Sequence, residues 1–294
     1  MTALFERGMS PRPFLLVLAL SARALASSTD QAFALYKDGK FADARKALEA
    51  VVATEPQNAR ACFCLGRCIM ATERSQQGLD EAVPWLEKAA KFAPSDPEIL
   101  AAYGEVCMQE AGIHISIPTA LRGRDAIEAA LAINPNDLVA RETLYQFYEQ
   151  APWPIGSSSK AAIQLEAIRA RDPDRAALIT ISTQIRVKDY AGAFKTCEGL
   201  FAKNPDSTFA LIQYGRVAAI SGQNLDRGLA YLKRFVALAP SAPKDPRLAN
   251  AWGRIGNIYE KLGNVDGARA AYQKMLQLEP GNKSAAAALA KLKQ

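Results

Sequence analysis

The sequence predicts an all-α fold, a right-handed solenoid of about seven helical hairpins closed by a C-terminal capping helix. Three observations lead to this prediction: a proline recurs every 32 to 41 residues, glycines recur in phase within helical patterns, and apolar residues repeat with helical spacing. A single hairpin of this length cannot cover its own apolar faces. Each unit must therefore stack against its neighbours.

The stretch 249–280 shows the pattern most clearly, as two amphipathic helices joined by Gly263 and Asn264. On each helix the apolar residues follow the spacing that gathers side chains on one face. These residues are Trp252, Ile255, Gly256 and Tyr259 on the first helix and Ala268, Tyr272 and Met275 on the second. Pro280 ends the unit, since proline cannot continue a helix.

The same proline ending recurs upstream, at Pro56, Pro94, Pro135, Pro173, Pro205 and Pro240. We therefore expect seven repeats and a cap. The expected repeats cover 30–57, 58–95, 96–136, 137–173, 174–205, 206–240 and 249–282, with the cap over 283–294. The second and fourth repeats carry the expected turns 72–78 and 152–159, and the third carries 112–118, where three isoleucines alternate with polar residues and predict a short extended segment.

These units resemble the tetratricopeptide repeat, whose signature is Trp, Leu-Gly, Tyr, Ala, Phe, Ala and Pro. The last unit fills these places with Trp252, Ile255-Gly256, Tyr259, Ala268, Tyr272, Met275 and Pro280, and the second with Cys62, Leu65-Gly66, Ile69, Ala82, Leu86, Ala89 and Pro94. The resemblance covers about residues 30–294. It implies a protein-interaction module that binds a peptide in a concave groove lined by the first helix of each repeat.

Small residues recur where two helices of a hairpin should cross. A glycine inside a helix costs about 0.5 to 1 kcal/mol relative to alanine, so glycines in phase indicate a steric requirement. The glycines are Gly66, Gly104, Gly215 and Gly256, and the small residues expected on the partner helices are Ala44, Ala82, Ala161, Ala193 and Ala268.

The N-terminus has the pattern of a secretory signal peptide over residues 1–26. Arg7 and Arg12 precede an apolar run at 14–20, and Ala24 and Ala26 occupy the positions that a signal peptidase reads. We expect cleavage after Ala26 and a periplasmic or secreted protein. An uncleaved anchor in the inner membrane and a start at Met9 instead of Met1 are the alternatives.

Charge and motifs exclude several classes of function. Loss of residues 1–26 removes three arginines and one glutamate, which lowers the formal net charge from +6 to +4. The remaining charge is diffuse, so we expect no nucleic-acid partner, and no stretch is long enough to predict a stable membrane span after cleavage. His114 is the only histidine and no phosphate-binding loop occurs, so we expect no enzyme and no cofactor.

Five cysteines are an odd number for an exported protein: Cys62, Cys64, Cys68, Cys107 and Cys197. The favoured interpretation is that they are buried free thiols acting as small hydrophobic residues. A disulfide, for example between Cys68 and Cys107, and a metal- or thiol-responsive site built from the first four cysteines remain as alternatives.

Two surfaces are candidates for partner binding. The groove implied by the resemblance would be lined by Phe63 and Arg67, Ala101 and Glu105, Ile212 and Arg216, and Gly253 and Asn257, with Arg254 beside them. Some members hold a peptide carboxylate there with Lys, Asn and Arg. Arg254 and Asn257 fit part of that pattern, but the lysines are missing. The alternative is that these arginines are solvated or pair with neighbouring acids.

The second candidate surface is a ridge of turns. Equivalent turns of a solenoid line up along one edge, so the three lengthened turns should adjoin and present His114 and Trp153. Packing of Trp153 against nearby isoleucines is the alternative. The sequence thus predicts a non-enzymatic scaffold with a protein or peptide partner, and leaves the oligomeric state open. A self-associating envelope assembly factor and a thiol- or metal-responsive adaptor are the other hypotheses.

Overall fold

The computed structural model describes residues 28–152, 154–238 and 246–292. Throughout these ranges the regular secondary structure is α-helical and no strand is present, which confirms the predicted all-α class. The signal-peptide segment and Trp153 lie outside the described residues. Among the described helices, none combines the length and hydropathy needed to cross a bilayer.

The chain divides into two compact units, with the boundary inside one helix between Leu165 and Glu166. The first unit holds a helix over 28–37, α2 (Phe41–Thr54), α3 (Ala59–Thr72), α4 (Gln76–Phe92), α5 (Pro97–His114), α6 (Ile117–Ile133), α7 (Leu138–Gln150) and most of α8 (Ser158–Arg169). The second holds α9 (Pro173–Arg186), α10 (Tyr190–Lys203), α11 (Thr208–Ser221), α12 (Leu225–Leu238), α13 (Pro246–Lys261), α14 (Val265–Leu278) and α15 (Lys283–Lys291).

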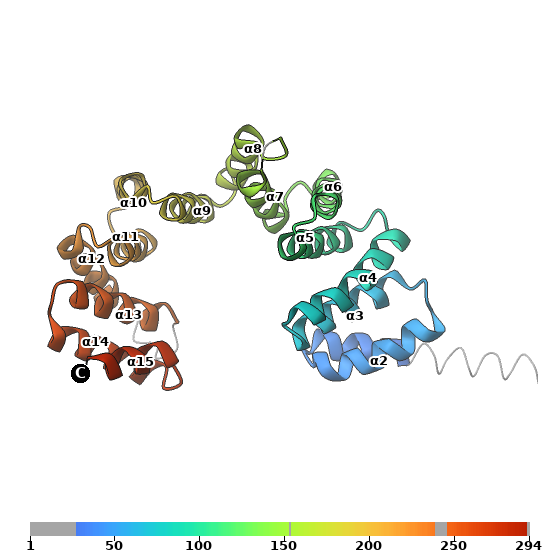
Figure 1. Cartoon of the computed structure of the whole chain (residues 1–294), viewed down its shortest axis with the longest axis horizontal. Helices are drawn as coiled ribbons and strands as arrows, with labels where there is room; N and C mark the ends of the chain where they lie inside the picture. The colour runs from blue at the N-terminus through green and yellow to red at the C-terminus, as the bar shows by residue number, and fades with distance from the viewer. Residues whose placement is uncertain (1–27, 153, 239–245, 293–294) are drawn as a thin grey trace, which may run out of the picture. The chain divides into compact units, whose positions relative to one another are not determined.

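Within each unit, consecutive helices pack as hairpins, and each hairpin packs on the next (Figure 1). Such pairs are α3 with α4 and α5 with α6 in the first unit, and α11 with α12 and α13 with α14 in the second. First helices also touch one another, α5 with α7 and α11 with both α9 and α13. This stacking of helical hairpins is the arrangement that the predicted solenoid class requires.

The small residues lie where the helices of a hairpin cross. A Cβ atom at Gly104 would lie 2.3 Å from Cγ1 of Ile127 and 2.7 Å from the carbonyl oxygen of Gly123. At Gly256, a Cβ atom would lie 2.4 Å from the Tyr272 ring. The partner alanines Ala44, Ala82, Ala161, Ala193 and Ala268 are all buried. These positions confirm that the recurrent glycines allow close helix packing.

Side-chain caps begin many of the helices, α5 among them. The Asp96 carboxylate accepts hydrogen bonds from the backbone N–H groups of Glu98 and Ile99 at 3.0 and 3.3 Å, at the start of α5. Pro173 differs from the prediction, because it does not close a repeat. Asp172 caps α9, and Pro173 is the first helical residue. Proline fits this position because the backbone N–H groups of the first turn make no hydrogen bond within the helix.

Two of the three lengthened turns prove to be short. Helix α5 continues to His114 and α6 begins at Ile117, so the extended segment predicted over 112–118 is wrong and only Ile115 and Ser116 connect the helices. In the second repeat α4 begins at Gln76, which leaves three residues in the turn and puts Pro84 inside the helix. Only the loop between α7 and α8, 151–157, is long as expected.

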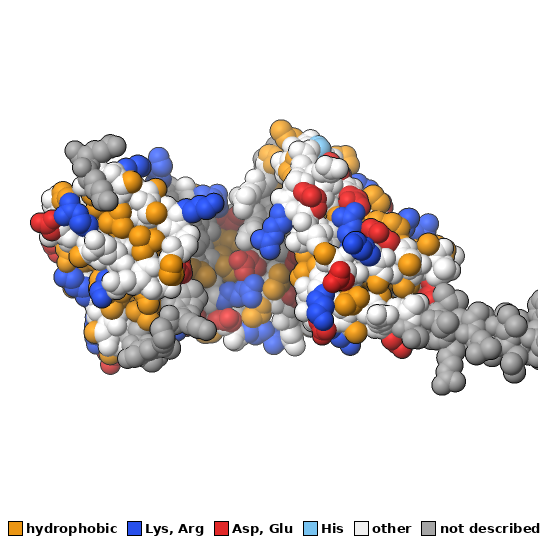
Figure 2. Space-filling view, turned by 90° about the horizontal axis from the view of Figure 1, so that it is seen from below, with side chains coloured by type: hydrophobic (Ala, Val, Ile, Leu, Met, Phe, Trp, Pro, Cys, Tyr) orange, Lys and Arg blue, Asp and Glu red, His pale blue; other side chains and the backbone are white. Residues whose placement is uncertain are grey.

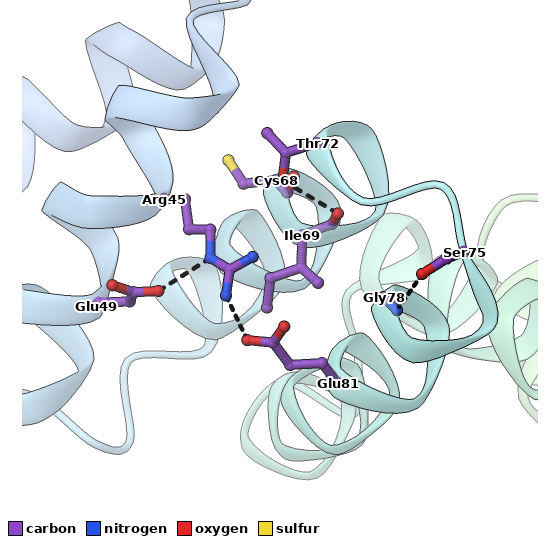
Figure 3. A network of polar contacts seen from close by, with 8 residues as sticks. All are labelled: Arg45, Glu49, Cys68, Ile69, Thr72, Ser75, Gly78 and Glu81. Atoms are coloured by element: carbon purple, nitrogen blue, oxygen red, sulfur yellow. Dashed lines mark hydrogen bonds and ion pairs between the residues drawn. The ribbon is translucent and has the colours of Figure 1, made fainter.

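Polar contacts on the surface join the first two repeats (Figure 3). Arg45 of α2 donates to Glu49 at 3.0 Å and to Glu81 of α4 at 2.6 Å, while Cys68 lies buried on α3 nearby. These pairs are exposed, and such pairs contribute about 0 to 1 kcal/mol each. The buried apolar faces, and not these ion pairs, therefore hold the hairpins together.

The C-terminal cap is present as predicted. Helix α15 packs on α14, and its Ala285 is buried against Ala249 and Met275. Its remaining residues are mostly exposed, as expected for a helix that covers the last open face of a stack.

Candidate functional site

All five cysteines are buried free thiols in the core. Burial raises the pKa of the Cys64 and Cys68 thiols to about 11 and that of the Cys197 thiol to about 12. Because the thiolate is the reactive and metal-binding form, thiol chemistry is suppressed at neutral pH. Within the described ranges, no cluster of His, Cys, Asp and Glu could hold a metal ion. The core interpretation of the cysteines is confirmed.

In the first unit, the predicted groove residues divide into floor and rim. Phe63 is only 2% exposed beneath the guanidinium of Arg60, and Ala101 is buried too, so these side chains offer little surface to a partner. Arg67 and Glu105 reach the surface of adjacent first helices, with Arg67 Nη1 3.9 Å from Glu105 Oε2. This distance is too long for a hydrogen bond.

In the second unit, Arg216 and Arg254 come together from neighbouring first helices, α11 and α13. Arg216 Nη1 donates to Ser182 Oγ of α9 at 3.2 Å and to Gln213 Oε1 at 3.4 Å. Ile212, predicted as a groove residue, is buried and offers little surface to a partner. Asn257 is exposed and its Oδ1 accepts a hydrogen bond of 2.6 Å from the Tyr272 hydroxyl.

Neither of these two guanidinium groups has an acidic partner in the part of the chain that the structure describes. Burial, and then the like charge of Arg216, lowers the pKa of Arg254 to about 10. A partly buried cation without a counter-ion is unfavourable, so the pair forms a positive site whose free energy an anion would lower.

The two ends of the described chain match known repeats. Residues 29–97 and 249–282 match models of the tetratricopeptide repeat. Over 92% of its length the chain is similar to all of a tetratricopeptide repeat protein from Parabacteroides merdae, with 16% identity and a TM-score of 0.61. It is also similar over 88% of its length to 98% of the C-terminal part of a TPR repeat-containing protein from Cytophaga hutchinsonii, with 17% identity and a TM-score of 0.51.

No curated protein sequence matches the chain. At these identities the solved structures establish the fold alone, and they agree with the all-α solenoid of tetratricopeptide-like hairpins.

On the face shown in Figure 2, basic and acidic side chains interleave instead of gathering into a field of one sign. Many arginines of the described ranges pair with carboxylates, such as Arg60 with Glu98 at 2.5 Å and Arg227 with Glu198 at 2.7 Å. Arg216 and Arg254 differ from these arginines, since neither forms an ion pair with a carboxylate of a described residue.

The expected ridge of turns takes a different form. His114 ends α5, and its Nε2 lies 3.4 Å from Asp80 Oδ1 of α4, so the edges of the second and third repeats do adjoin. The turn between α5 and α6 in turn borders the long 151–157 loop across a cavity. Trp153 lies outside the described residues.

Sequence reasoning missed two features of these sites. Ser182 and Gln213, which hold Arg216, fall outside the groove spacing and carry no motif. The glutamines that line the cavity beside the 151–157 loop also went unnoticed, because single glutamines on a helix are usually solvated. For both sites, the residues meet only through the stacking of separate repeats.

Proposed function

We propose that this protein is a non-enzymatic interaction scaffold of an exported compartment that binds an acidic peptide segment on the first helices of its second unit. The observation that supports this most strongly is the pair of Arg216 and Arg254, neither of which has an acidic partner among the described residues. Guanidinium groups bind carboxylates through paired hydrogen bonds, and two of them can hold a ligand in a fixed orientation. Tetratricopeptide repeats generally mediate protein–protein interactions.

Several neighbouring groups favour a peptide over a free anion. Ser182 and Gln213 already fix the orientation of Arg216, so its head group is held ready for a ligand. Asn257 adds an exposed amide one turn from Arg254 on the same helix. Together they offer anchors for a carboxylate and for nearby peptide amides.

The test compares two labelled, capped decapeptides, one with four glutamates and one with four glutamines in their places. By fluorescence anisotropy, we expect the acidic peptide to bind the intact protein at least tenfold more tightly. The Arg216→Met, Arg254→Met double variant should bind both peptides equally. Arg227→Met removes an arginine that already pairs with Glu198 and serves as the control. Equal binding of both peptides by the unaltered protein would contradict the proposal.

Export rests on the signal-peptide pattern at residues 1–26, and it has its own test. The full chain is produced in a Gram-negative host, and N-terminal sequencing is carried out on protein from the periplasmic fraction. We expect the mature chain to begin at Ser27. Recovery of the full-length chain from the cytoplasm alone would exclude this part of the proposal.

A further inference from the structure

A cavity of about 620 Å³ lies in the first unit, between α5, α7 and the 151–157 loop. Its walls are mainly apolar, and side-chain amides stand among them. The apolar walls include Met108, Ile115, Ile117, Phe147, Pro152 and Ile155. The volume lies in the range that accommodates a small ligand or a few side chains of a peptide.

The charge of this cavity comes from one residue, because Glu105 is the only charged residue among the described residues that line it. Its carboxylate makes no hydrogen bond to a described residue, and its ion-pair partner Arg67 lies 3.9 Å away, from Nη1 to Oε2. Burial raises the pKa of this carboxyl group, and the positive charge of Arg67 lowers it by a smaller amount. A ligand cation or N–H group would therefore find an acceptor here, whereas a ligand carboxylate or phosphate would be repelled.

The amides of Gln109 and Gln150 also line the cavity, and neither makes a hydrogen bond to another described residue. A carboxamide can both donate and accept, so these groups suit the backbone amides of a peptide. They stand beside apolar walls, which suit aliphatic side chains.

Ile115 at the mouth of the cavity provides a separate observation. Its backbone is left-handed, with φ +51° and ψ +47°, at the position after α5 where glycine or asparagine is usual. Such a conformation is an outlier for a β-branched residue. The side chain is nevertheless 89% exposed, so contacts with described residues do not compensate for this conformation. Ile113 and Ile117 beside it are about half exposed, at 48% and 50%.

We propose that this cavity binds a segment of a partner protein that places aliphatic side chains against Ile115 and Phe147 and a lysine or arginine against Glu105. The charge of the lining selects this occupant. An acyl chain ending in a carboxylate would meet Glu105. A purely apolar ligand would leave the two amides without partners and the carboxylate with Arg67 at 3.9 Å alone. The site lies in the first unit and prefers a basic segment, so it is distinct from the arginine pair of the second unit.

The test uses a labelled, capped octapeptide with one arginine followed by two leucines in a glycine–serine background. Its twin carries citrulline, which keeps the shape of arginine without the charge. By anisotropy, we expect the arginine peptide to bind the full chain about fivefold or more tightly than the twin. Glu105→Gln should remove this preference, whereas Glu98→Gln, on the same helix but outside the cavity, should keep it.

A second variant separates binding from folding. Ile115→Asn places a residue that tolerates the left-handed conformation at the mouth of the cavity. We expect its melting temperature to rise by about 2 °C or more while both peptides bind about fivefold more weakly. The Arg216→Met, Arg254→Met variant should bind both peptides as the unaltered protein does, so failure of one site is distinguished from failure of the other. Equal affinity of the twins for the unaltered protein, or no binding of either at millimolar concentration, would overturn the proposal.

Discussion

Gly104→Ala is expected to lower the free energy of unfolding by about 2 kcal/mol, since overpacking a tight contact typically costs 1 to 3 kcal/mol. The added Cβ would lie 2.3 Å from Ile127 Cγ1 and 2.7 Å from the Gly123 carbonyl oxygen. A side chain can change its rotamer, but the carbonyl belongs to the backbone of α6. The two helices must therefore move apart, and the buried contacts between them weaken.

The matched control for this substitution is Gly199→Ala in α10. Position 199 has no heavy atom within 4 Å of the added Cβ, so only the helix propensity changes. This variant should be more stable by about 0.5 to 1 kcal/mol. Urea denaturation followed by circular dichroism measures both changes. Equal and small changes at the two positions would show that α5 and α6 do not approach as closely as the structure has them.

The second large effect is expected for Arg254→Met, which should bind the acidic peptide about tenfold more weakly and yet make the protein more stable. Methionine keeps much of the apolar stem of arginine and removes the charged end. Because Arg254 is partly buried beside Arg216 and has no described acidic partner, loss of its charge should stabilise the fold by about 1 kcal/mol. Gain of stability with loss of binding is typical of a functional residue.

The pH dependence of this gain follows from the pKa of Arg254. The folded protein holds this proton less tightly, because burial lowers the pKa of Arg254 to about 10, well below the usual value of an arginine, so the charged form destabilises the fold at neutral pH. As the pH rises through 10 the folded protein loses the proton first. The stability difference between Arg254→Met and the unaltered protein should therefore be largest near pH 7 and shrink towards pH 10 and above.

The repeat pattern made the fold predictable, because each hairpin needs the same local signals: a capped helix start and a small residue where its two helices cross. Asp96 before Pro97 indicates a helix start, and Gly104 in phase with Gly66 indicates a close crossing, whatever the partner. The turn at 112–118 was mispredicted because its local pattern is ambiguous. Alternation of apolar residues over so few positions fits an extended segment, but it also fits a helix end that absorbs Ile113 and His114.

The candidate sites could be predicted only in part. Spacing within one repeat placed Arg216 on a first helix, but whether an acid reaches it depends on side chains from α9 and α13, about 35 residues away in sequence on either side. The cavity near Ile115 needs the left-handed conformation of that residue and the path of the 151–157 loop. Neither property follows from local periodicity.

The most direct test of a binding role for the second unit is a set of thermal melts of the unaltered protein and Arg254→Met, each with and without saturating acidic peptide. Without peptide, Arg254→Met should melt about 2 to 4 °C higher. With peptide, the melting temperature of the unaltered protein should rise by several degrees and that of Arg254→Met should rise clearly less, since tenfold weaker binding removes up to about 1.4 kcal/mol of the stabilisation by the ligand. A lower melting temperature for Arg254→Met without peptide, or equal shifts of both proteins with peptide, would contradict the proposed site.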